Sequence, residues 1–263
     1  MSAAGLLDTI VAATRHAVDV RARARPLASL TRGLQRGPDG DAFAATLRDQ
    51  ASFPRIIAEC KRRSPSKGIL RQDYDAPAHA RAYAEAGAAA ISVLTEPTFF
   101  DGASAHLAAV RAAVGVPILR KDFIVSDYQL VEAVDLGADA ALLIVSALTD
   151  DELRSLLRTC RGLGLAALVE VHDDGEADQA VAAGATIVGV NCRNLRTLAV
   201  DTAVHESVVR RLPGGVIAVA ESGLRTRADL DRLAAAGYRA FLVGERLIAQ
   251  PDPAAALREL RGQ

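Results

Sequence analysis

The stretch 137–145, Gly-Ala-Asp-Ala-Ala-Leu-Leu-Ile-Val, sets a glycine a few residues ahead of an unbroken apolar run, 140–145. A run without alternating polar residues is typical of a strand in a parallel sheet that helices cover. The glycine before it suits the left-handed conformation that ends a helix. Similar glycines stand at Gly87, Gly184 and Gly237, each shortly before another apolar run. This weak internal repeat predicts a chain of alternating strands and helices.

Eight apolar runs follow one another from Pro54 onward, and a helical pattern follows each of them. They are Arg55–Glu59, Ala89–Thr95, Val116–Lys121, Ala140–Val145, Leu165–Val171, Thr186–Asn191, Val216–Ser222 and Ala240–Gly244. Eight parallel strands with covering helices in one domain predict an α/β fold, a single (β/α)8 TIM barrel. A doubly wound open sheet would give a similar periodicity and is the alternative.

The segment before these runs has a different pattern. Residues 1–53 contain two helical patterns, Leu6–Arg25 and Asp41–Gln50, separated by a stretch with Gly, Arg and Pro around Arg32–Gly40. We expect residues 1–53 to form an N-terminal helical extension packed on the barrel, and residues 54–263 to form the barrel itself. No low-complexity linker divides the chain, so the sequence predicts one domain overall.

The composition limits the possible functions. The chain has 263 residues, 50% of them apolar, and a formal net charge of -1, so it lacks the basic excess usual in nucleic-acid-binding proteins. No apolar run approaches the roughly 20 residues that cross a bilayer, and the N-terminus lacks a signal-peptide pattern. We therefore expect a soluble, cytoplasmic protein without a nucleic-acid or membrane partner. Monomer and weak homodimer both stay open.

The cysteines and most histidines are expected to play no part in chemistry. Three cysteines, odd in number and widely spaced, predict reduced thiols without a disulfide or a metal site; they are Cys60, Cys160 and Cys192. Four histidines in helical or loop regions have no acidic partner at ligand spacing and are expected at the surface; they are His16, His79, His106 and His205. His172, two residues after Glu170, is expected to lie behind the site.

Lysine is rare, and its rarity is informative. Of 31 cationic residues, only Lys61, Lys67 and Lys121 are lysines. A lysine can change its pKa and give up a proton, whereas an arginine holds its proton at any physiological pH. In a chain this biased toward arginine, we expect lysine to persist where a guanidinium cannot serve.

Polar residues end the apolar runs at the carboxyl ends of the predicted strands, where barrel enzymes carry their active sites. They are Glu59, Lys61, Lys121, Glu170, Asn191, Glu221 and Ser222. A single Glu or Lys at such a position is usually a solvated rim residue or half of an ion pair. Here acids, lysines and an amide arise at the same end of five strands, which predicts one active site.

Two kinds of loop would complete this site. Residues 59–68, Glu-Cys-Lys-Arg-Arg-Ser-Pro-Ser-Lys-Gly, form either an exposed basic turn or a mobile flap over an anionic ligand. Ser222-Gly223 and Gly244-Glu245 follow the last two runs, and the second pair opens a short helical segment to Ile248. Ordinary turns also need glycine, but both loops fall where phosphosugar barrels bind phosphate.

Seven motifs carry a resemblance to a known family. They are 57–66 (Ile-Ala-Glu-Cys-Lys-Arg-Arg-Ser-Pro-Ser), Ser92–Glu96 with Phe100, Leu119–Phe123, Leu168–His172, Gly189–Leu195, Ala220–Gly223 and Phe241–Glu245. In this order they resemble the indole-3-glycerol-phosphate synthase family, from about Pro54 to Ile248. One departure is Arg246, which stands where the family commonly has a serine.

The resemblance implies an enzyme, a carboxy-lyase of tryptophan biosynthesis. Its substrate would be 1-(2-carboxyphenylamino)-1-deoxyribulose 5-phosphate, whose ring closure gives indole-3-glycerol phosphate, carbon dioxide and water. This acid–base chemistry implies no cofactor. A phosphoribosylanthranilate isomerase would share the fold and phosphate loops but has no use for a lysine pair. A catalytically silent ligand-binding barrel is the other alternative, and the retained lysines and glutamates speak against it.

The resemblance also implies roles for the acid–base residues. Lys121 would be the general acid at the ketone, with a pKa lowered by desolvation. Lys61 would contact the substrate carboxylate, and Glu59 would exchange protons during dehydration. Glu170 would stabilise positive charge at the anilino nitrogen. Asn191 and Glu221 would orient hydroxyls and lysines.

The remaining residues would bind the two ends of the substrate. Arg193 would pair with an anionic group, and Phe100 and Leu195 would form apolar walls for the aromatic ring. The implied phosphate cradle consists of Ser64, Ser222, Gly223, Gly244 and Glu245. The expected ligand is therefore a small anionic phosphosugar.

Overall fold

A computed structural model describes residues 5–263 of the chain except residues 35, 50, 52 and 196. Eight parallel strands form a closed barrel in the order β1-β10-β9-β8-β7-β6-β5-β4. They are β1 (Arg55–Cys60), β4 (Ala90–Leu94), β5 (Ile118–Lys121), β6 (Ala140–Ile144), β7 (Ala166–Val171), β8 (Ile187–Asn191), β9 (Ile217–Glu221) and β10 (Ala240–Val243). Each lies within or one residue beyond a predicted run. The predicted (β/α)8 TIM barrel is confirmed, and the open sheet is excluded.

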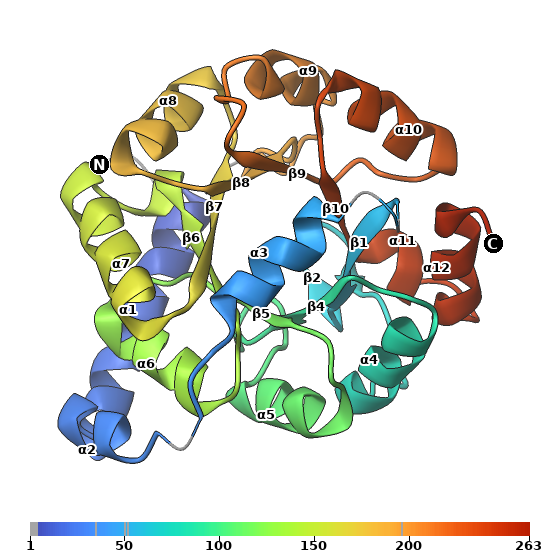
Figure 1. Ribbon diagram of the computed structural model, residues 1–263. Coiled ribbons are helices and arrows are strands. Elements are labelled where there is room, and N and C mark those ends of the chain that lie inside the picture. The colour runs from blue at the N-terminus through green and yellow to red at the C-terminus, as the bar shows by residue number, and fades with distance from the viewer. Residues whose placement is uncertain (1–4, 35, 50, 52, 196) are drawn as a thin grey trace.

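Helices surround the barrel as an outer ring (Figure 1). They are α4 (Ala76–Glu85), α5 (Ser104–Ala113), α6 (Asp127–Asp135), α7 (Asp150–Leu163), α8 (Asp174–Ala183), α9 (Ala203–Val209), α10 (Arg227–Ala236), α11 (Glu245–Ile248) and α12 (Pro253–Arg261), with a 3-10 turn η1 (Val145–Ala147) after β6. The glycines of the internal repeat have φ values of 86° at Gly87, 92° at Gly137, 91° at Gly184 and 123° at Gly237. These values confirm the predicted positive-φ helix ends.

Successive strand residues face opposite sides of the barrel wall. Ile57, Leu119 and Leu168 belong to a buried cluster inside the barrel. Their neighbours Ile56 and Ile118 belong to a second buried cluster, between the strands and the helices. Both faces of each strand are therefore apolar, which explains why the sequence shows continuous runs instead of alternation.

The segment expected as a loop after β1 pairs with itself. Arg63–Ser64 (β2) and Gly68–Ile69 (β3) form a short antiparallel hairpin. Gly68, at the start of β3, has a φ of 68°. A two-residue strand has too little apolar pattern to be recognised in a sequence. We call residues 61–70 the flap.

In the described part of the segment before β1, three helices precede the barrel: α1 (Leu6–Ala24), α2 (Leu27–Arg32) and α3 (Gly40–Arg48). The sequence predicted α1 and α3 and missed α2; Gln50, the predicted end of α3, lies outside the described residues. Phe43 and Leu47 of α3 are fully buried in the inner cluster. A Cβ at Gly40 would collide with the backbone at the start of β7, so glycine lets α3 approach the barrel closely.

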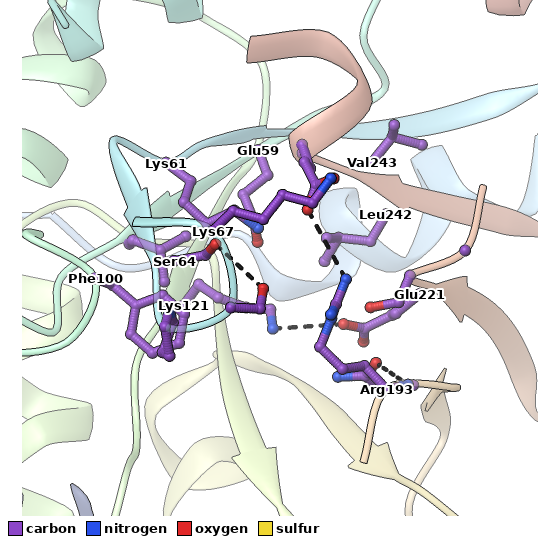
Figure 2. Close-up of a pocket in the computed structure, with 18 of the residues that line it drawn as sticks. Glu59, Lys61, Ser64, Lys67, Phe100, Lys121, Arg193, Glu221, Leu242 and Val243 are labelled. Carbon is purple, nitrogen blue, oxygen red and sulfur yellow. Dashed lines mark hydrogen bonds and ion pairs between the residues drawn. The ribbon is translucent and has the colours of Figure 1, made fainter. Parts of the chain in front are cut away.

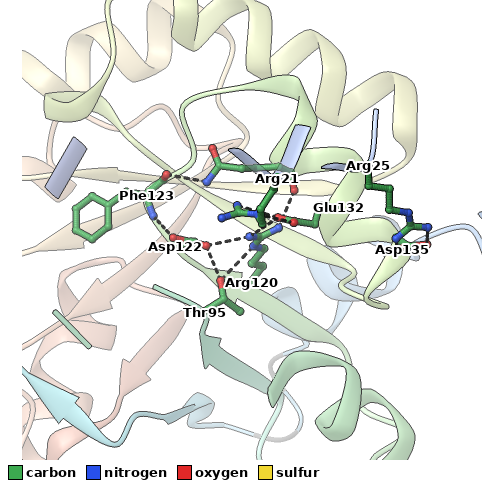
Figure 3. Close-up of polar contacts among 9 residues, drawn as sticks. Arg21, Arg25, Thr95, Arg120, Asp122, Phe123, Glu132 and Asp135 are labelled. Atoms are coloured by element: carbon green, nitrogen blue, oxygen red, sulfur yellow. Dashed lines mark hydrogen bonds and ion pairs between the residues drawn. The ribbon is translucent and has the colours of Figure 1, made fainter. Parts of the chain in front are cut away.

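Helix α1 is joined to the barrel by ion pairs (Figure 3). Arg21 binds both carboxylate oxygens of Glu132 on α6, at 2.9 and 3.2 Å, and Arg25 pairs with Asp135.

The division of the chain at residue 53 stays a prediction. Among the residues that the structure describes, no helix has the length and apolar character needed to cross a membrane.

Candidate active site

One cavity of about 690 Å³ opens at the carboxyl ends of the strands. Every candidate residue from the sequence lines it; the acid–base candidates are Glu59, Lys61, Lys121, Glu170, Asn191, Glu221 and Ser222, and the binding candidates are Ser64, Phe100, Arg193, Leu195, Gly223, Gly244 and Glu245. Residues that are far apart in the sequence thus share one space (Figure 2). What each of them does is not decided by this placement.

The alternation of the strands brings the charged groups together. Lys121 comes two residues after Leu119, and Glu170 two residues after Leu168, so both side chains continue the inward-facing set. The inner face is apolar near the strand starts and becomes charged at the strand ends. The pattern places three buried glutamates, Glu59, Glu170 and Glu221, around Lys121.

Lys121 is held by carboxylates. Its Nζ lies 3.0 Å from Glu170 Oε2 and 3.4 Å from Glu221 Oε2. Burial alone would lower the pKa of Lys121, but Glu170, Glu221 and Glu59 raise it above its usual value. The expectation of a lowered pKa is therefore wrong: desolvation was considered without the carboxylates that only the fold brings near. Lys121 is an ammonium in the ligand-free protein.

Glu170 has two further polar partners besides Lys121, one through a hydrogen bond and one through an ion pair. Asn191 Nδ2 donates to Oε1 over 3.1 Å, and His172 Nε2 lies 3.2 Å from the same oxygen. Burial would raise the pKa of Glu170, but Lys121 and His172 bring it well below its usual range. His172 also contacts Glu176, at 2.9 Å; burial opposes its charge, yet the two carboxylates raise its pKa to about 10. Glu170 is therefore a carboxylate with a charged histidine behind it.

Glu221 is in the opposite state. Burial raises the pKa of its carboxyl to about 8, with Lys121 opposing and Glu170 adding to the rise. Its Oε1 is buried and has no hydrogen-bond partner among the described residues. A Cβ at Gly189 on β8 would collide with this oxygen, so the glycine leaves room for the carboxyl. Near neutral pH Glu221 carries a proton and can donate it.

Glu59 and Lys61 form a second acid–base pair. Lys61 Nζ lies 2.6 Å from Glu59 Oε1, and Ser92 Oγ lies 3.5 Å from Oε2. Burial would raise the pKa of Glu59, but Lys61 and Lys121 lower it. A Cβ at Gly244 would collide with the Glu59 carboxylate. Gly244 therefore shapes the acid–base site as well as the loop that follows β10.

The two glycine loops lie beside cationic side chains. Ser222 and Gly223 both have positive φ, 65° and 69°, which turns the chain sharply after β9. Such a turn exposes backbone N–H groups to an anion. Arg246, the departure from the family pattern, also lines the cavity, where its Nε donates to the Arg225 carbonyl over 3.1 Å and its Nη2 pairs with Glu259 at 2.8 Å.

Apolar side chains form the opposite wall. Phe100 lies 6.1 Å from Phe123, centroid to centroid, and the backbone N–H of Phe100 donates to the buried Glu96 carboxylate. Sequence reasoning missed the contribution of α1, whose Leu6, Leu7 and Ile10 also line the cavity. Their helical spacing marked an apolar face but gave no sign of the surface it would cover.

Two histidines expected at the surface are buried. His79 is 9% exposed and His205 only 1%. His205 Nε2 lies 3.0 Å from the backbone oxygen of Glu221, and the Tyr238 hydroxyl donates to the His205 carbonyl over 2.8 Å. The expectation failed because backbone partners leave no spacing signal in a sequence. The cysteines are free thiols, as predicted.

Carboxyls and ammonium groups buried together at the C-terminal end of a (β/α)8 barrel define an acid–base enzyme of the barrel class. Residues 7–260 match the family model described as indole-3-glycerol phosphate synthase. An indole-3-glycerol phosphate synthase of Nocardioides sp. is 50% identical over 258 residues, which cover 98% of both chains. One of Azospirillum brasilense is 45% identical, over 94% of this chain and 95% of the other. The chain belongs to the indole-3-glycerol phosphate synthase family.

Solved structures of more distant proteins resemble this chain in fold. A 3-hexulose-6-phosphate synthase superposes with a TM-score of 0.62 at 18% identity, over 79% of this chain and 98% of the other. The N-acetylmannosamine-6-phosphate 2-epimerase from Clostridium perfringens gives 0.58 at 15% identity, over 73% and 86%. At such identities the likeness concerns the barrel alone.

Proposed function

We propose that this chain closes the indole ring of 1-(2-carboxyphenylamino)-1-deoxyribulose 5-phosphate, giving indole-3-glycerol phosphate, carbon dioxide and water. The observation that carries the proposal is the position of Lys121, whose Nζ lies within 3.4 Å of both Glu170 and Glu221. The pKa of Glu170 is lowered and that of Glu221 is raised. Ring closure and dehydration need acids and bases side by side, and this cluster supplies both.

The proton balance explains why several acids are needed. The ketone oxygen leaves as water and needs two protons. One is released from the carbon next to the anilino nitrogen. The substrate carboxylate leaves as neutral carbon dioxide without giving up a proton, so the second must come from solvent by way of the enzyme. In each turnover, therefore, an acid gives up a proton that solvent replaces, and a base takes the proton released from the carbon.

Lys121 is the donor for the first step. The aromatic carbon that bears the carboxylate attacks the ketone carbon, and negative charge grows on the ketone oxygen. An alkoxide is a stronger base than an amine, so Lys121 can give it a proton even with a raised pKa. The carboxylate of Glu170 then stabilises the positive charge at the anilino nitrogen until carbon dioxide leaves.

Dehydration uses the remaining pair. Lys61 contacts the substrate carboxylate at the outset and, once that carboxylate has left, gives its proton to the departing hydroxyl, which leaves as water. Its Nζ is 2.6 Å from Glu59, so Glu59 can return to Lys61 the proton that it takes from the carbon. Glu59, ionised in the free protein, takes the proton from the carbon next to the nitrogen. Glu221 and Asn191 orient the departing hydroxyl and the lysines, with Glu221 donating its proton in a hydrogen bond.

The phosphate lies at the glycine loops, in this proposal. The sharp turn at Ser222 and Gly223 offers backbone N–H groups, and Gly244, Glu245 and Ser64 line the same cavity. The anthranilate ring packs against the wall that contains Phe100 and Leu195. We further propose that the protein is cytoplasmic and that it is a monomer or a weak homodimer. Sedimentation of the purified protein measures its oligomeric state.

The direct test is an assay of product formation. Purified protein is incubated with the anthranilate phosphosugar, and indole fluorescence is followed. The chain contains no tryptophan, so the indole signal arises only from the product. We expect stoichiometric release of indole-3-glycerol phosphate and carbon dioxide. No product at any protein concentration would remove the proposal.

A further inference from the structure

The carboxylate of Glu245 lies between two cations at the phosphate end of the cavity. Lys67 Nζ is 2.5 Å from its Oε1, and Arg193 Nη2 is 3.8 Å from its Oε2. The three side chains come from different segments: the flap, the loop after β8, and the first residue of α11. In Figure 2 Lys67 and Arg193 approach one another from opposite sides of the cavity. All three residues line that cavity.

This arrangement opposes the binding of a phosphate. A carboxylate next to a phosphate dianion repels it, and the repulsion is strong within a few ångströms. Glu245 directly follows Gly244, so its side chain cannot be far from an anion held at that loop. Two of the cations that line this end of the cavity, Lys67 and Arg193, are already paired with Glu245. The carboxylate therefore stands where it competes with the ligand.

We propose that Glu245 is an internal anion of the phosphate subsite: in the free protein it neutralises Lys67 and Arg193, and the phosphate of the substrate displaces it from them. The inference rests on the proposed position of the phosphate at the Gly223 and Gly244 loops. It goes beyond the place of Glu245 in the phosphate cradle, because it gives the side chain an effect that opposes phosphate affinity.

The exposure of the three groups makes the exchange feasible. The side chains of Lys67, Glu245 and Arg193 are 56%, 31% and 26% exposed. Ion pairs at such exposure contribute little to stability, so an incoming dianion can replace the carboxylate. Lys67 belongs to the flap, so its contact with Glu245 joins the flap to the first residue of α11 before substrate binds. Afterwards Lys67 pairs with the phosphate, and the flap stays over the filled cavity.

The probe is inorganic phosphate, measured by calorimetric titration and as a competitive inhibitor. Glu245→Gln keeps the shape of the side chain and removes its charge. We expect it to tighten phosphate binding by roughly five- to tenfold, the scale of removing one unit charge a few ångströms away in a solvated site. The KM of the substrate should fall in parallel. Glu206→Gln is the matched control, because Glu206 pairs with Arg232 on the outside of the barrel.

A double-mutant cycle tests the exchange itself. Lys67→Gln should weaken phosphate binding, and Glu245→Gln should gain less in that background, because one of the two released cations is gone. Unchanged or weaker phosphate binding by Glu245→Gln in the otherwise natural chain overturns the inference. The backbone amide resonances of Gly223 and Gly244 separate the two proposals. If they do not shift with phosphate, the phosphate position is wrong; if they shift and Glu245→Gln gains nothing, only the internal anion is wrong.

Discussion

Lys121 shows how little a single residue type says about acid–base behaviour. Desolvation would make this lysine a better acid, but three carboxylates raise its pKa instead. The proposed role of Lys121, proton donor to the ketone oxygen, needs a group that is charged in the free protein and can give up its proton during the reaction. Arginine satisfies only the first condition, which gives the scarcity of lysine in this chain a chemical reason.

The first prediction concerns that distinction. Lys121→Arg keeps the positive charge among the glutamates but removes a transferable proton. We expect turnover to fall by about 10²-fold or more, the usual scale for losing a general acid. The competitive inhibition constant of inorganic phosphate should stay close to that of the natural chain, which shows that the fold is intact. A variant with unchanged kcat would mean that Lys121 acts by charge alone.

The second prediction concerns pH. Glu221 has a pKa raised to about 8, so kcat/KM should fall as the pH rises through that value and the donor is lost. Glu221→Gln keeps a hydrogen-bond donor at every pH, and its profile should stay flat between pH 7 and about 9.

Stability gives an independent reading of the same group. Its unfolded pKa is near 4.5, so between pH 4.5 and about 8 the folded state binds more protons than the unfolded state. The contribution of Glu221 to the free energy of unfolding should therefore fall as the pH rises through this range. Denaturant titrations should show that fall in the natural chain relative to Glu221→Gln. Equal pH dependence in both proteins would contradict the protonated state of Glu221.

At the scale of elements, strand β8 contributes to the site through a glycine, Gly189, that leaves space for a neighbouring side chain. Gly189 pairs with Glu170 in the register of β7 and β8, and its missing side chain makes space for Glu221. A strand interior is a costly place for glycine, because glycine loses much conformational freedom on folding. The cost is offset by room for a buried carboxyl next to Lys121.

The third prediction tests this reading of β8. Gly189→Ala should displace the Glu221 carboxyl and lower kcat by at least about tenfold, a usual scale for misplacing a catalytic group. Circular dichroism and the melting temperature show whether the barrel persists.

Gly162→Ala is the matched control: Gly162 lies on α7 with nothing within 4 Å of an added Cβ. It should keep full activity and gain about 0.5–1 kcal/mol of stability. Full activity in Gly189→Ala would show that Glu221 can move without consequence.

At the scale of the whole molecule, a buried network joins α1 to the strand that carries Lys121 (Figure 3). Arg120 is 1% exposed and pairs with Asp122 at 3.0 Å and with Glu132 at 2.8 Å. Arg21 of α1 binds the same Glu132, so two arginines share two carboxylates. The network balances its charges, which is the condition for burying them.

The fourth prediction follows from that balance. Arg120→Met should lower the free energy of unfolding by about 3–5 kcal/mol, because it leaves Asp122 buried without its cation and Glu132 with Arg21 as its remaining one. Arg25→Gln removes a pair that is half exposed and should cost less than about 1 kcal/mol. Urea titrations of both variants measure the difference. Similar costs for the two would mean that solvent reaches the Arg120 network.

The sequence by itself determined the barrel and the residues that line the candidate site. Strands that are buried on both faces are apolar throughout, and glycines end several of the helices. Both the apolar runs and the glycines can be recognised in short stretches of sequence. The candidate residues could be found because a barrel gathers the carboxyl ends of all its strands. We could identify Glu59, Glu170 and Glu221 as candidate site residues without knowing which residues they contact.

Only the tertiary structure decided the charge states and the partners. Glu59, Glu170 and Glu221 are chemically identical and all buried, yet the pKa is lowered at Glu59 and Glu170 and raised at Glu221, because their distances to Lys121, Lys61 and His172 differ. The burial of His205, the pairing of Lys67 with Glu245 and the wall supplied by α1 are likewise long-range. An electrostatic interaction depends on distance in space and on exclusion of water, and neither quantity is a property of local sequence.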